Sequence, residues 1–366
     1  MTRAWALAGA AALAAGLGLA RPATAADEPQ RPASYPLVFL FQGDAVVESS
    51  PSGGGDDPTA GSHLRLRRLR FGEDLRLGDF RVRAIVEASS RDEAFAPVEG
   101  QRIPLAGSVR LPEAFVAWRP HRAFEVAAGA TRVPLSLSRQ VDELDLRLPE
   151  RAQAVVALAP DYRTGVAVTS DLGAMNLRVA GMSADTSLDQ HLFSSGFFGA
   201  ARIGADPIGP MGVAPWRRRR DDPWYCWPRF SAGVSLLYGT LLAPRTLAFG
   251  ADAQVQARRL TITGEYLAQH LDAHAAALPA QGAVVEPGVY LIRERLELVL
   301  RSAWYHQPAS AGLAYASTDT LAGGGALTFL ARDAHLRFQA GLELRHTLDH
   351  RLPDSSWGIV RLTLAL

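Results

Sequence analysis

The sequence predicts an all-β fold, a transmembrane antiparallel β-barrel of about sixteen strands with short periplasmic turns and longer outer loops. Extended segments alternate apolar and polar side chains with period two, which places the two kinds on opposite faces of a strand. Many segments approach the roughly ten residues that a tilted strand needs to cross a bilayer. A secretory signal precedes them. In residues 335–345 one face carries Leu336, Phe338, Ala340, Leu342 and Leu344, and the other carries His335, Arg337, Gln339, Glu343 and Arg345.

The first 25 residues have the three parts of a secretory signal peptide. Arg3 supplies the positive region, residues 4–20 are an apolar Ala/Leu/Gly segment, and residues 23–25 offer a small-residue cleavage site. A membrane anchor is the weaker alternative, because the segment is short and Arg21 and Pro22 end it. We expect a signal peptide at 1–25, a periplasmic tail at 26–34 and a transmembrane barrel at 35–366, located in the bacterial outer membrane.

The barrel region divides into extended segments separated by turns. They are 37–47, 63–73, 79–88, 109–118, 124–133, 163–169, 175–182, 197–204, 230–238, 246–256, 260–269, 288–292, 296–305, 320–331, 335–346 and 356–366. Short turns alternate with longer links at 49–61, 89–107, 183–195 and 271–287. A soluble β-sandwich would also alternate, but its strands average about five to six residues. The longer segments favour the membrane barrel.

Charged side chains fall on the strand face opposite the apolar one. An arginine facing lipid near the bilayer midplane costs roughly 2–4 kcal/mol, so these charges should face a water-filled lumen. Predicted pore-lining residues on the strands are Arg81, Arg83, Arg178, Arg301, Arg337 and Arg345. Arg67 and Arg68 break the pattern because they are adjacent, so either a β-bulge shifts the register or one side chain snorkels to an interface. Seven aromatic residues suit interfacial girdles: Tyr35, Trp118, Tyr238, Tyr266, Trp304, Tyr305 and Trp357.

Composition excludes some functions. The formal net charge is +1, so nothing indicates a nucleic-acid partner, and the single cysteine excludes an internal disulfide and disfavours a cysteine-based metal site. The chain has no lysine, so all 38 Lys-plus-Arg positions are arginine. A GC-rich genome could produce that bias alone. Guanidinium groups nevertheless bind oxyanions in a two-pronged manner. We expect neither a cofactor nor a metal.

Several segments resemble the bacterial phosphate-selective porin O/P family. They are 67–71 (RRLRF), 111–118 (LPEAFVAW), 129–136 (GATRVPLS) and 150–152 (ERA), with further similarity over 260–269, 295–305 and 327–344. The resemblance implies a sixteen-stranded barrel, often a homotrimer in outer-membrane lipid, that passes small anions through a pore narrowed by an inward loop. Two features depart from that family. Without lysine, no lysine-dependent phosphate site carries over, and the last residue is Leu366 rather than an aromatic.

The link at 138–151 follows the Arg132 segment and mixes charges of both signs. Folded into the lumen beside Arg132, it would form a constriction, where rings of charge select ions by sign. Its charged residues are Arg139, Asp142, Glu143, Asp145, Arg147, Glu150 and Arg151. A solvated outer loop is the alternative. Mixed signs favour weak selectivity over a dedicated phosphate channel.

The expected function is therefore a porin that gives passive diffusion of small hydrophilic solutes, favouring anions such as phosphate, and not an enzyme. One alternative is a structural or adhesive barrel plugged by its loops, and a less favoured one is a barrel lipase. His270 and His274 lack the Glu of a zinc-protease motif, and Ser138 and Ser195 lack a nucleophile elbow. The run at 216–227 (WRRRRDDPWYCW) suits either a solvated turn with aromatic anchors or a site for lipid phosphate, peptidoglycan or a periplasmic partner. Permeant solute and oligomeric state stay open.

Overall fold

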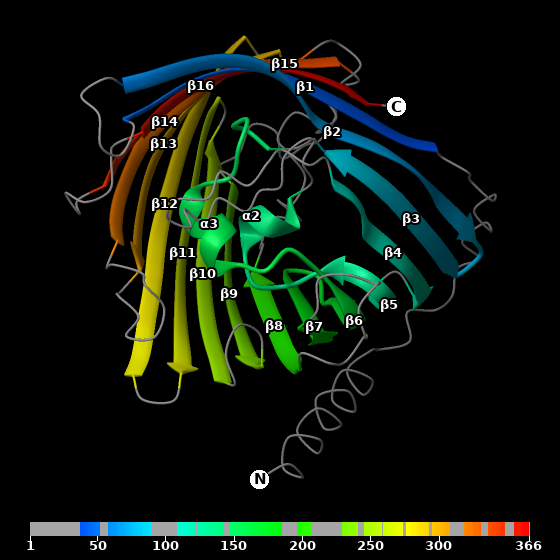
Figure 1. Ribbon diagram of the computed structural model, residues 1–366. Helices are drawn as coiled ribbons and strands as arrows, with labels where there is room; N and C mark the ends of the chain where they lie inside the picture. Colours follow the sequence, from blue (N-terminus) through cyan, green and yellow to red (C-terminus); the bar gives the residue numbers. More distant parts are fainter. Residues whose placement is uncertain are drawn as a thin grey trace.

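The computed structural model is a closed barrel of sixteen antiparallel strands in the residues it describes, each strand pairing with its neighbours in the chain (Figure 1). Those residues are 37–51, 58–89, 108–121, 123–141, 146–184, 196–205, 229–240, 245–257, 259–273, 276–292, 295–307, 318–330, 336–347 and 355–365. The ring closes where β1 pairs with β16, from Leu40 opposite Ala365 to Ser49 opposite Ser356. Closure satisfies the backbone groups of both edge strands, which lipid could not do.

All sixteen predicted segments coincide with a strand, so the predicted fold class is confirmed. The strands are β1 (Leu37–Pro51), β2 (Pro58–Leu77), β3 (Phe80–Ser89), β4 (Ser108–His121), β5 (Phe124–Arg132), β6 (Tyr162–Asp171), β7 (Met175–Ser183), β8 (Phe197–Ala205), β9 (Arg229–Gly239), β10 (Arg245–Ala257), β11 (Leu260–Ala273), β12 (Ala276–Ile292), β13 (Leu296–Gln307), β14 (Thr318–Leu330), β15 (Leu336–Thr347) and β16 (Ser355–Ala365). Two short helices, α2 (Leu137–Gln140) and α3 (Gln153–Leu158), lie between β5 and β6.

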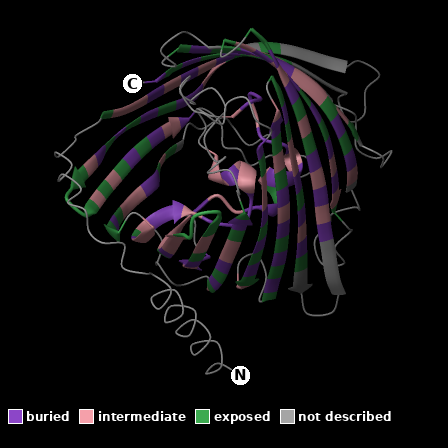
Figure 2. Cartoon of the chain, turned by 180° about the vertical axis from the view of Figure 1, so that it is seen from behind, coloured by how far each residue is buried: buried purple, intermediate pink, exposed green. Residues whose placement is uncertain are grey.

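The two faces of each strand differ as the alternation predicts. On β15 the outward Phe338, Leu342 and Leu344 are 43–55% exposed, whereas the inward Arg337 and Gln339 are 3% and 2% exposed. The same banding of exposed and buried residues runs along the other strands (Figure 2). The barrel therefore presents a continuous apolar outer surface and keeps its charges inside.

A β-bulge accounts for the adjacent arginines on β2. The register to β1 passes from Gln42 opposite Arg68 directly to Gly43 opposite Leu66, so Arg67 has no partner in this ladder. The extra residue changes the parity of the strand, and Arg67 and Arg68 both turn inward with 5% and 1% exposure. The bulge is thus the correct alternative, and neither side chain snorkels.

β12 is much longer than predicted. The link expected at 271–287 is mostly strand, since β12 begins at Ala276 and runs for 17 residues. Proline cannot donate to a ladder, so Pro287 interrupts the pairing of any strand that contains it. The strand accommodates it by a gap in its pairing with β13, which passes from Val285 opposite Ser302 to Gly288 opposite Val299.

Two aromatic residues, Tyr305 and Trp357, face the other way from prediction; Trp357 of β16 stands opposite the inward Glu343 of β15, on the inward parity. Tyr238 and Tyr266 are outward and 51% and 36% exposed, as an interfacial girdle requires. Tyr305 is wrong as a girdle residue because it lies on the inward parity of β13 and is 7% exposed. Adjacent aromatics on one strand cannot share a face, so Trp304 and Tyr305 had to separate.

Several predicted features lie outside the described residues: the signal peptide at 1–25, the tail at 26–34, the basic and aromatic run at 216–227, and nearly all of the links at 89–107 and 183–195. They stay predictions. Among the described residues, no helix has the length and apolar character needed to cross a membrane.

The outward face provides a test of the bilayer depth of the strands. Leu300 lies in the middle of β13 and Leu260 begins β11 beside a turn, and both point outward with 52% and 58% exposure. Replacing Leu300 with Arg should lower the free energy of unfolding in liposomes by about 2–4 kcal/mol, whereas Leu260→Arg should cost about 0–1 kcal/mol near the interface. Urea titration with a fluorescence readout measures both, and equal costs would contradict the assigned depths.

Candidate pore constriction

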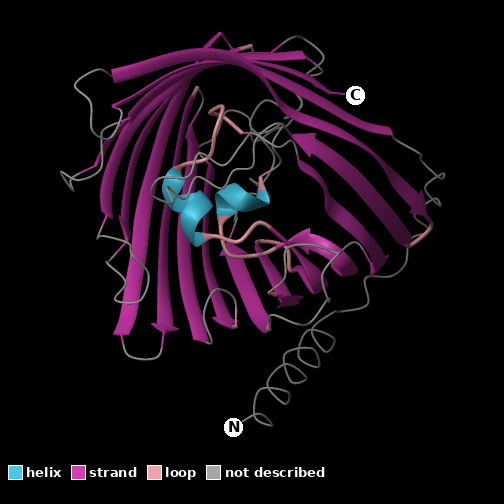
Figure 3. Ribbon diagram, viewed as in Figure 1, coloured by secondary structure: helices cyan, strands magenta, loops and turns pink. Residues whose placement is uncertain are grey.

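The segment between β5 and β6 lies inside the barrel. Figure 3 places α2 and α3 within the ring of strands, away from its rim. We call residues 133–161 the inward loop, of which 133–141 and 146–161 are described. Pro134 stands two residues after Arg132, the end of β5, and cannot extend its ladder, so the chain leaves the wall there.

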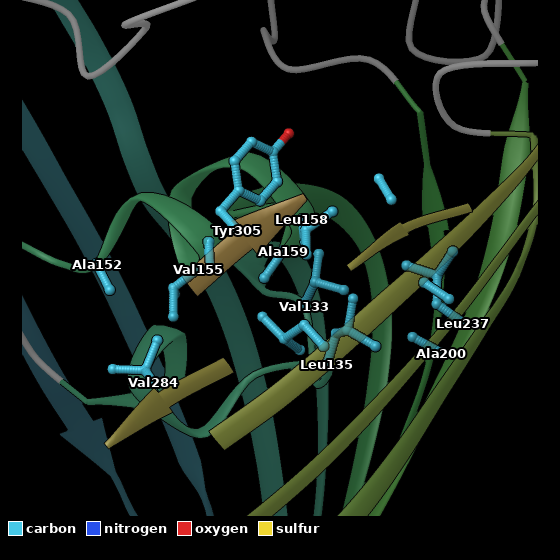
Figure 4. Close-up of a cluster of buried hydrophobic side chains, with 14 of the residues drawn as sticks. Val133, Leu135, Ala152, Val155, Leu158, Ala159, Ala200, Leu237, Val284 and Tyr305 are labelled. Atoms are coloured by element: carbon cyan, nitrogen blue, oxygen red, sulfur yellow. The ribbon is translucent and has the colours of Figure 1, made fainter. Parts of the chain in front are cut away.

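The inward loop is held on one side by apolar packing. Val133, Leu135, Val155 and Leu158 are at most 2% exposed and pack against inward-facing apolar side chains (Figure 4). The wall residues in this cluster are Ala167, Ala180, Met182, Phe198, Ala200, Leu237, Ala248, Leu267, Ala280, Val284, Ala303, Tyr305 and Ala322. This part of the lumen is filled by a hydrophobic core.

Alternation alone did not predict this core, because it assigned polar character to the inward parity. A signal was present in the sequence. Phe197 and Phe198 on β8, and Leu236 and Leu237 on β9, are apolar on both parities. A strand that is apolar on both faces needs an apolar cover inside the barrel, and the inward loop provides it.

Glu150, in the interior of the inward loop, anchors the loop to the wall. Its carboxylate accepts hydrogen bonds from Arg67 Nη2 at 2.8 Å, Arg361 Nη2 at 2.8 Å and Arg65 Nη2 at 3.1 Å. Asp44 binds two of the same guanidiniums, with Arg361 Nε at 2.7 Å and Arg65 Nε at 3.1 Å. These five residues, the Glu150 cluster, join β16, β1 and β2 to the loop across the point where the barrel closes.

The cluster keeps Glu150 ionised. Burial opposes its charge, but Arg67, Arg361 and Arg65 outweigh that cost and lower the pKa of Glu150 to about 2. The carboxylate therefore holds its three arginines throughout the neutral and mildly acidic range.

Arg147 crosses from the inward loop to three strands. It binds Glu297 of β13 through Nη2 at 2.7 Å and Nε at 2.9 Å, and donates to Thr261 of β11 and to the carbonyl of Glu286 on β12 at 3.2 Å. Its guanidinium lies where a Cβ of Gly288 would stand. Glycine at this position therefore makes room for the arginine.

Arg301 and its neighbours form a second charged group on the wall. Arg301 binds Glu286 at 2.8 Å and Glu343 at 3.1 Å, and donates to the carbonyl of Glu150 at 2.7 Å. Arg345 shares Glu343 at 2.7 Å, and Arg337 donates to the carbonyl of Leu146. Arginines of β13 and β15 thus bind the inward loop partly through hydrogen bonds to the backbone carbonyls of the loop.

Arg139 and Arg151 bond within the inward loop. Arg139 donates to the carbonyls of Ala159 and Val156 and pairs with Asp161 at 3.4 Å. Arg151 donates to the carbonyls of Ser138 and Val141 at 3.1 and 3.0 Å. These bonds close the loop on itself.

The remaining predicted site residues lie on β3, β5 and β7. Arg81 and Arg83 share Asp74, with Arg81 Nε at 2.7 Å and Arg83 Nη1 at 3.3 Å. Arg132 and Arg178 share Gln140 of α2, where Arg132 Nη1 donates to the main-chain oxygen at 2.8 Å and Arg178 Nη1 to the side-chain oxygen at 2.5 Å.

Exposure divides the eleven predicted site residues into two sets. Partly exposed are Arg81, Arg83, Arg132, Glu150, Arg178 and Arg345, and buried are Arg139, Arg147, Arg151, Arg301 and Arg337. The predicted site did not include Asp44, Asp252 or Glu265, whose partners come from other parts of the chain. Alternation places Asp252 and Glu265 on the lumenal face, but their pairing cannot be read from it.

The described residues also bear on the metal and nucleophile candidates in the sequence. They contain no group of three or more His, Cys, Asp or Glu that could hold a metal ion. Ser138 Oγ donates to Glu265 Oε2 at 2.6 Å, and the same carboxylate accepts from the backbone N–H groups of Leu137 and Ser138 at the start of α2. His274, Ser195 and Cys226 lie outside the described residues.

A closed antiparallel barrel with an apolar outer surface and charged interior is an outer-membrane β-barrel, which places the chain in the bacterial outer membrane. No family model matches the sequence, and no curated protein matches it either. Solved structures do match in fold, and those described next are porins and an outer-membrane protein.

OprB of Pseudomonas putida is 11% identical, with a TM-score of 0.61 over 91% of this chain and 94% of its own. An anion-selective porin from Comamonas acidovorans is 10% identical, with a TM-score of 0.57 over 91% and 100%. OmpT, an outer membrane protein of Vibrio cholerae in a trimer form, is 10% identical, with a TM-score of 0.55 over 91% and 100%. At these identities the likeness is one of fold.

Acid should release the part of the inward loop around Glu150 only at low pH. A carboxylate with a depressed pKa gives its full stabilisation above its ordinary value, here 4.5, and loses it as pH falls towards about 2. Spin labels at Ala157 and Leu172, in a Cys226→Ser background, should keep one distance distribution from pH 7 to 4.5 and broaden below about pH 3. Glu150→Gln should broaden it already at pH 7; an unchanged distribution in that variant would contradict the anchoring role.

Substitution of Gly288 tests whether the Arg147 guanidinium occupies the space beside this glycine. Gly288→Val should expel the Arg147 guanidinium and leave Glu297, which is 0% exposed, without its partner. Breaking a buried pair in this way costs about 3–5 kcal/mol. Gly323→Val on β14 is the control, because a Cβ there meets nothing within 4 Å. Thermal unfolding in detergent compares the two variants. Equal stability would refute the placement of the Arg147 guanidinium beside Gly288.

Proposed function

We propose that the chain is a passive outer-membrane channel for small hydrophilic solutes that favours small anions such as phosphate. The supporting observation is the inward placement of charge with arginine in excess. Among buried charged side chains of the described residues, arginines outnumber carboxylates. Charged rings inside a pore select ions by sign, and guanidiniums bind oxyanions through paired hydrogen bonds.

The predicted site residues take two roles in this proposal. The partly exposed set, with Arg81 and Arg83 on β3, Arg132 on β5 and Arg178 on β7, lines the path of the solute. The buried set, with Arg147 and Arg301, holds the inward loop that narrows it. Because many guanidiniums are paired with carboxylates, selectivity should be a preference and not an exclusion of cations.

The comparisons support the proposal at the level of the fold. One similar structure is named an anion-selective porin, and another is a trimer form. We extend both properties to this chain as proposals: a homotrimer, embedded in outer-membrane lipid, with small anions as its solutes.

The apolar core beneath the inward loop favours one rival, a structural barrel whose lumen is plugged. A plugged barrel would have the same strands and the same ion pairs. It would give no conductance, and liposomes containing it would not swell in sugar.

Planar-bilayer recording tests the channel and its preference separately. The purified chain should show ohmic conductance in KCl, and a KCl gradient should give a reversal potential of the anion-selective sign. Arg81→Gln combined with Arg83→Gln should shift that potential towards zero, because their lumenal charge is removed. Arg259→Gln, in the exposed β10–β11 turn, is the matched control and should leave it unchanged.

Absence of conductance would refute the channel and leave the plugged barrel. A reversal potential of the cation-selective sign would refute the anion preference alone.

A further inference from the structure

Helix α2 is held at its two ends by opposite charges on the barrel wall. At its beginning, Glu265 of β11 accepts from Leu137 N at 2.9 Å, Ser138 N at 3.3 Å and Ser138 Oγ at 2.6 Å. At its end, Arg132 and Arg178 donate to the two oxygens of Gln140. The position of α2 in the lumen therefore depends on a carboxylate at one end and two guanidiniums at the other.

The wall charges belong to one row across β7 to β11. Arg178 stands directly opposite Arg202, and Asp252 stands directly opposite Glu265. Like charges in directly opposite positions destabilise a sheet. The row relieves this because Arg202 leans over Gly233 of β9 and binds Asp252 at 2.6 and 2.8 Å. The inner pair neutralises itself, and the outer Arg178 and Glu265 are left to the ends of α2.

Arg178 has weaker partners than Arg202, the other guanidinium of the row. Its Nη1 meets the neutral amide oxygen of Gln140 at 2.5 Å, and its buried Nε has no hydrogen-bond partner among the described residues. A charged donor forms roughly twice as strong a bond with an anionic oxygen as a neutral pair forms. The Gln140 amide thus occupies a place that an oxyanion would fill better.

Arg132 adds a second guanidinium at the same place. One of its partners, the carboxylate of Glu113 at 3.5 Å, also binds Arg83 at 2.5 Å and accepts from Tyr162 Oη at 3.0 Å. Arg132 donates to the Gln140 main-chain oxygen, while Arg178 holds the side chain of the same residue. Two guanidiniums therefore converge on one neutral residue of the loop.

We propose that a small oxyanion in the lumen displaces the Gln140 side chain from Arg178, binds between Arg178 and Arg132, and releases the end of α2. This inference rests on the proposed channel, because the anion reaches the site through the lumen. Occupancy of the site is then coupled to the position of the inward loop. Phosphate and carboxylate groups both have the required paired oxygens.

Binding to the full chain in detergent tests the site without requiring conduction. Isothermal titration in Tris chloride uses sodium phosphate in one arm and sodium acetate in the other. Arg178→Gln should weaken oxyanion binding about 10- to 100-fold, the loss expected for a hydrogen bond to a charged group. Gln140→Ala should bind more tightly than the native chain, because the competing amide is gone. Arg259→Gln is the control and should bind as the native chain does.

A second readout follows the loop. Spin labels at Ala157 and Leu172 should change their distance distribution on adding the anion that binds, and should not respond in Arg178→Gln. If that variant does not fold, as judged by heat-modifiable mobility, Gln140→Ala still decides the question.

Equal affinity in the native chain and Arg178→Gln, absence of oxyanion binding, or weaker binding in Gln140→Ala would overturn the inference. These outcomes are independent of the channel. A conducting protein without Arg178-dependent binding refutes the inference alone, and a non-conducting protein that binds the anion refutes the channel alone.

Discussion

The structure depends on satisfying every backbone hydrogen bond within the chain while hydrocarbon surrounds it. Lipid offers no donor or acceptor, so a sheet that crosses a membrane must close on itself. The pairing of β1 with β16 meets this requirement over ten residue pairs. Once the sheet is closed, period-two alternation sends one set of side chains to lipid and the other into the lumen. Every arginine that the strands carry inward has to find its partners there.

Those partners are shared between the wall and the inward loop. Asp44 is a cross-strand neighbour of both Arg361 and Arg65, and Glu150 of the loop then joins the same two guanidiniums. A buried charge without partners is costly, so a loop that brings a carboxylate or a carbonyl to such a wall is held in place. The opposite side of the loop uses apolar packing instead. Two kinds of force thus fix one segment in the lumen, and the part of the wall from β2 to β7 keeps its partly exposed arginines.

Much of the fold could be predicted because alternation is a local property. Strands such as β15 carry their faces in their own residues, and all sixteen segments were recognised in this way. Local exceptions needed pairing information. Arg67 and Arg68 were recognised as an anomaly, but only the register of β2 against β1 decided between a bulge and snorkelling. The predicted extent of β12 was too short. Whether a strand can continue past a proline depends on a gap in its pairing with the neighbouring strand, which one strand's sequence does not show.

On strands with regular alternation, such as β15, the sequence by itself determined which side chains face lipid and which face the lumen, since the pleat turns successive residues to opposite sides. It also placed a mixed-charge link after Arg132. The tertiary structure alone decided which guanidinium meets which carboxylate, as with Arg361 and Asp44, which are 317 positions apart. It also decided that β8 and β9 carry an apolar inner face under Val133 and Leu135. Such contacts depend on closure and on the path of the loop, and both arise from the whole chain rather than from any one segment.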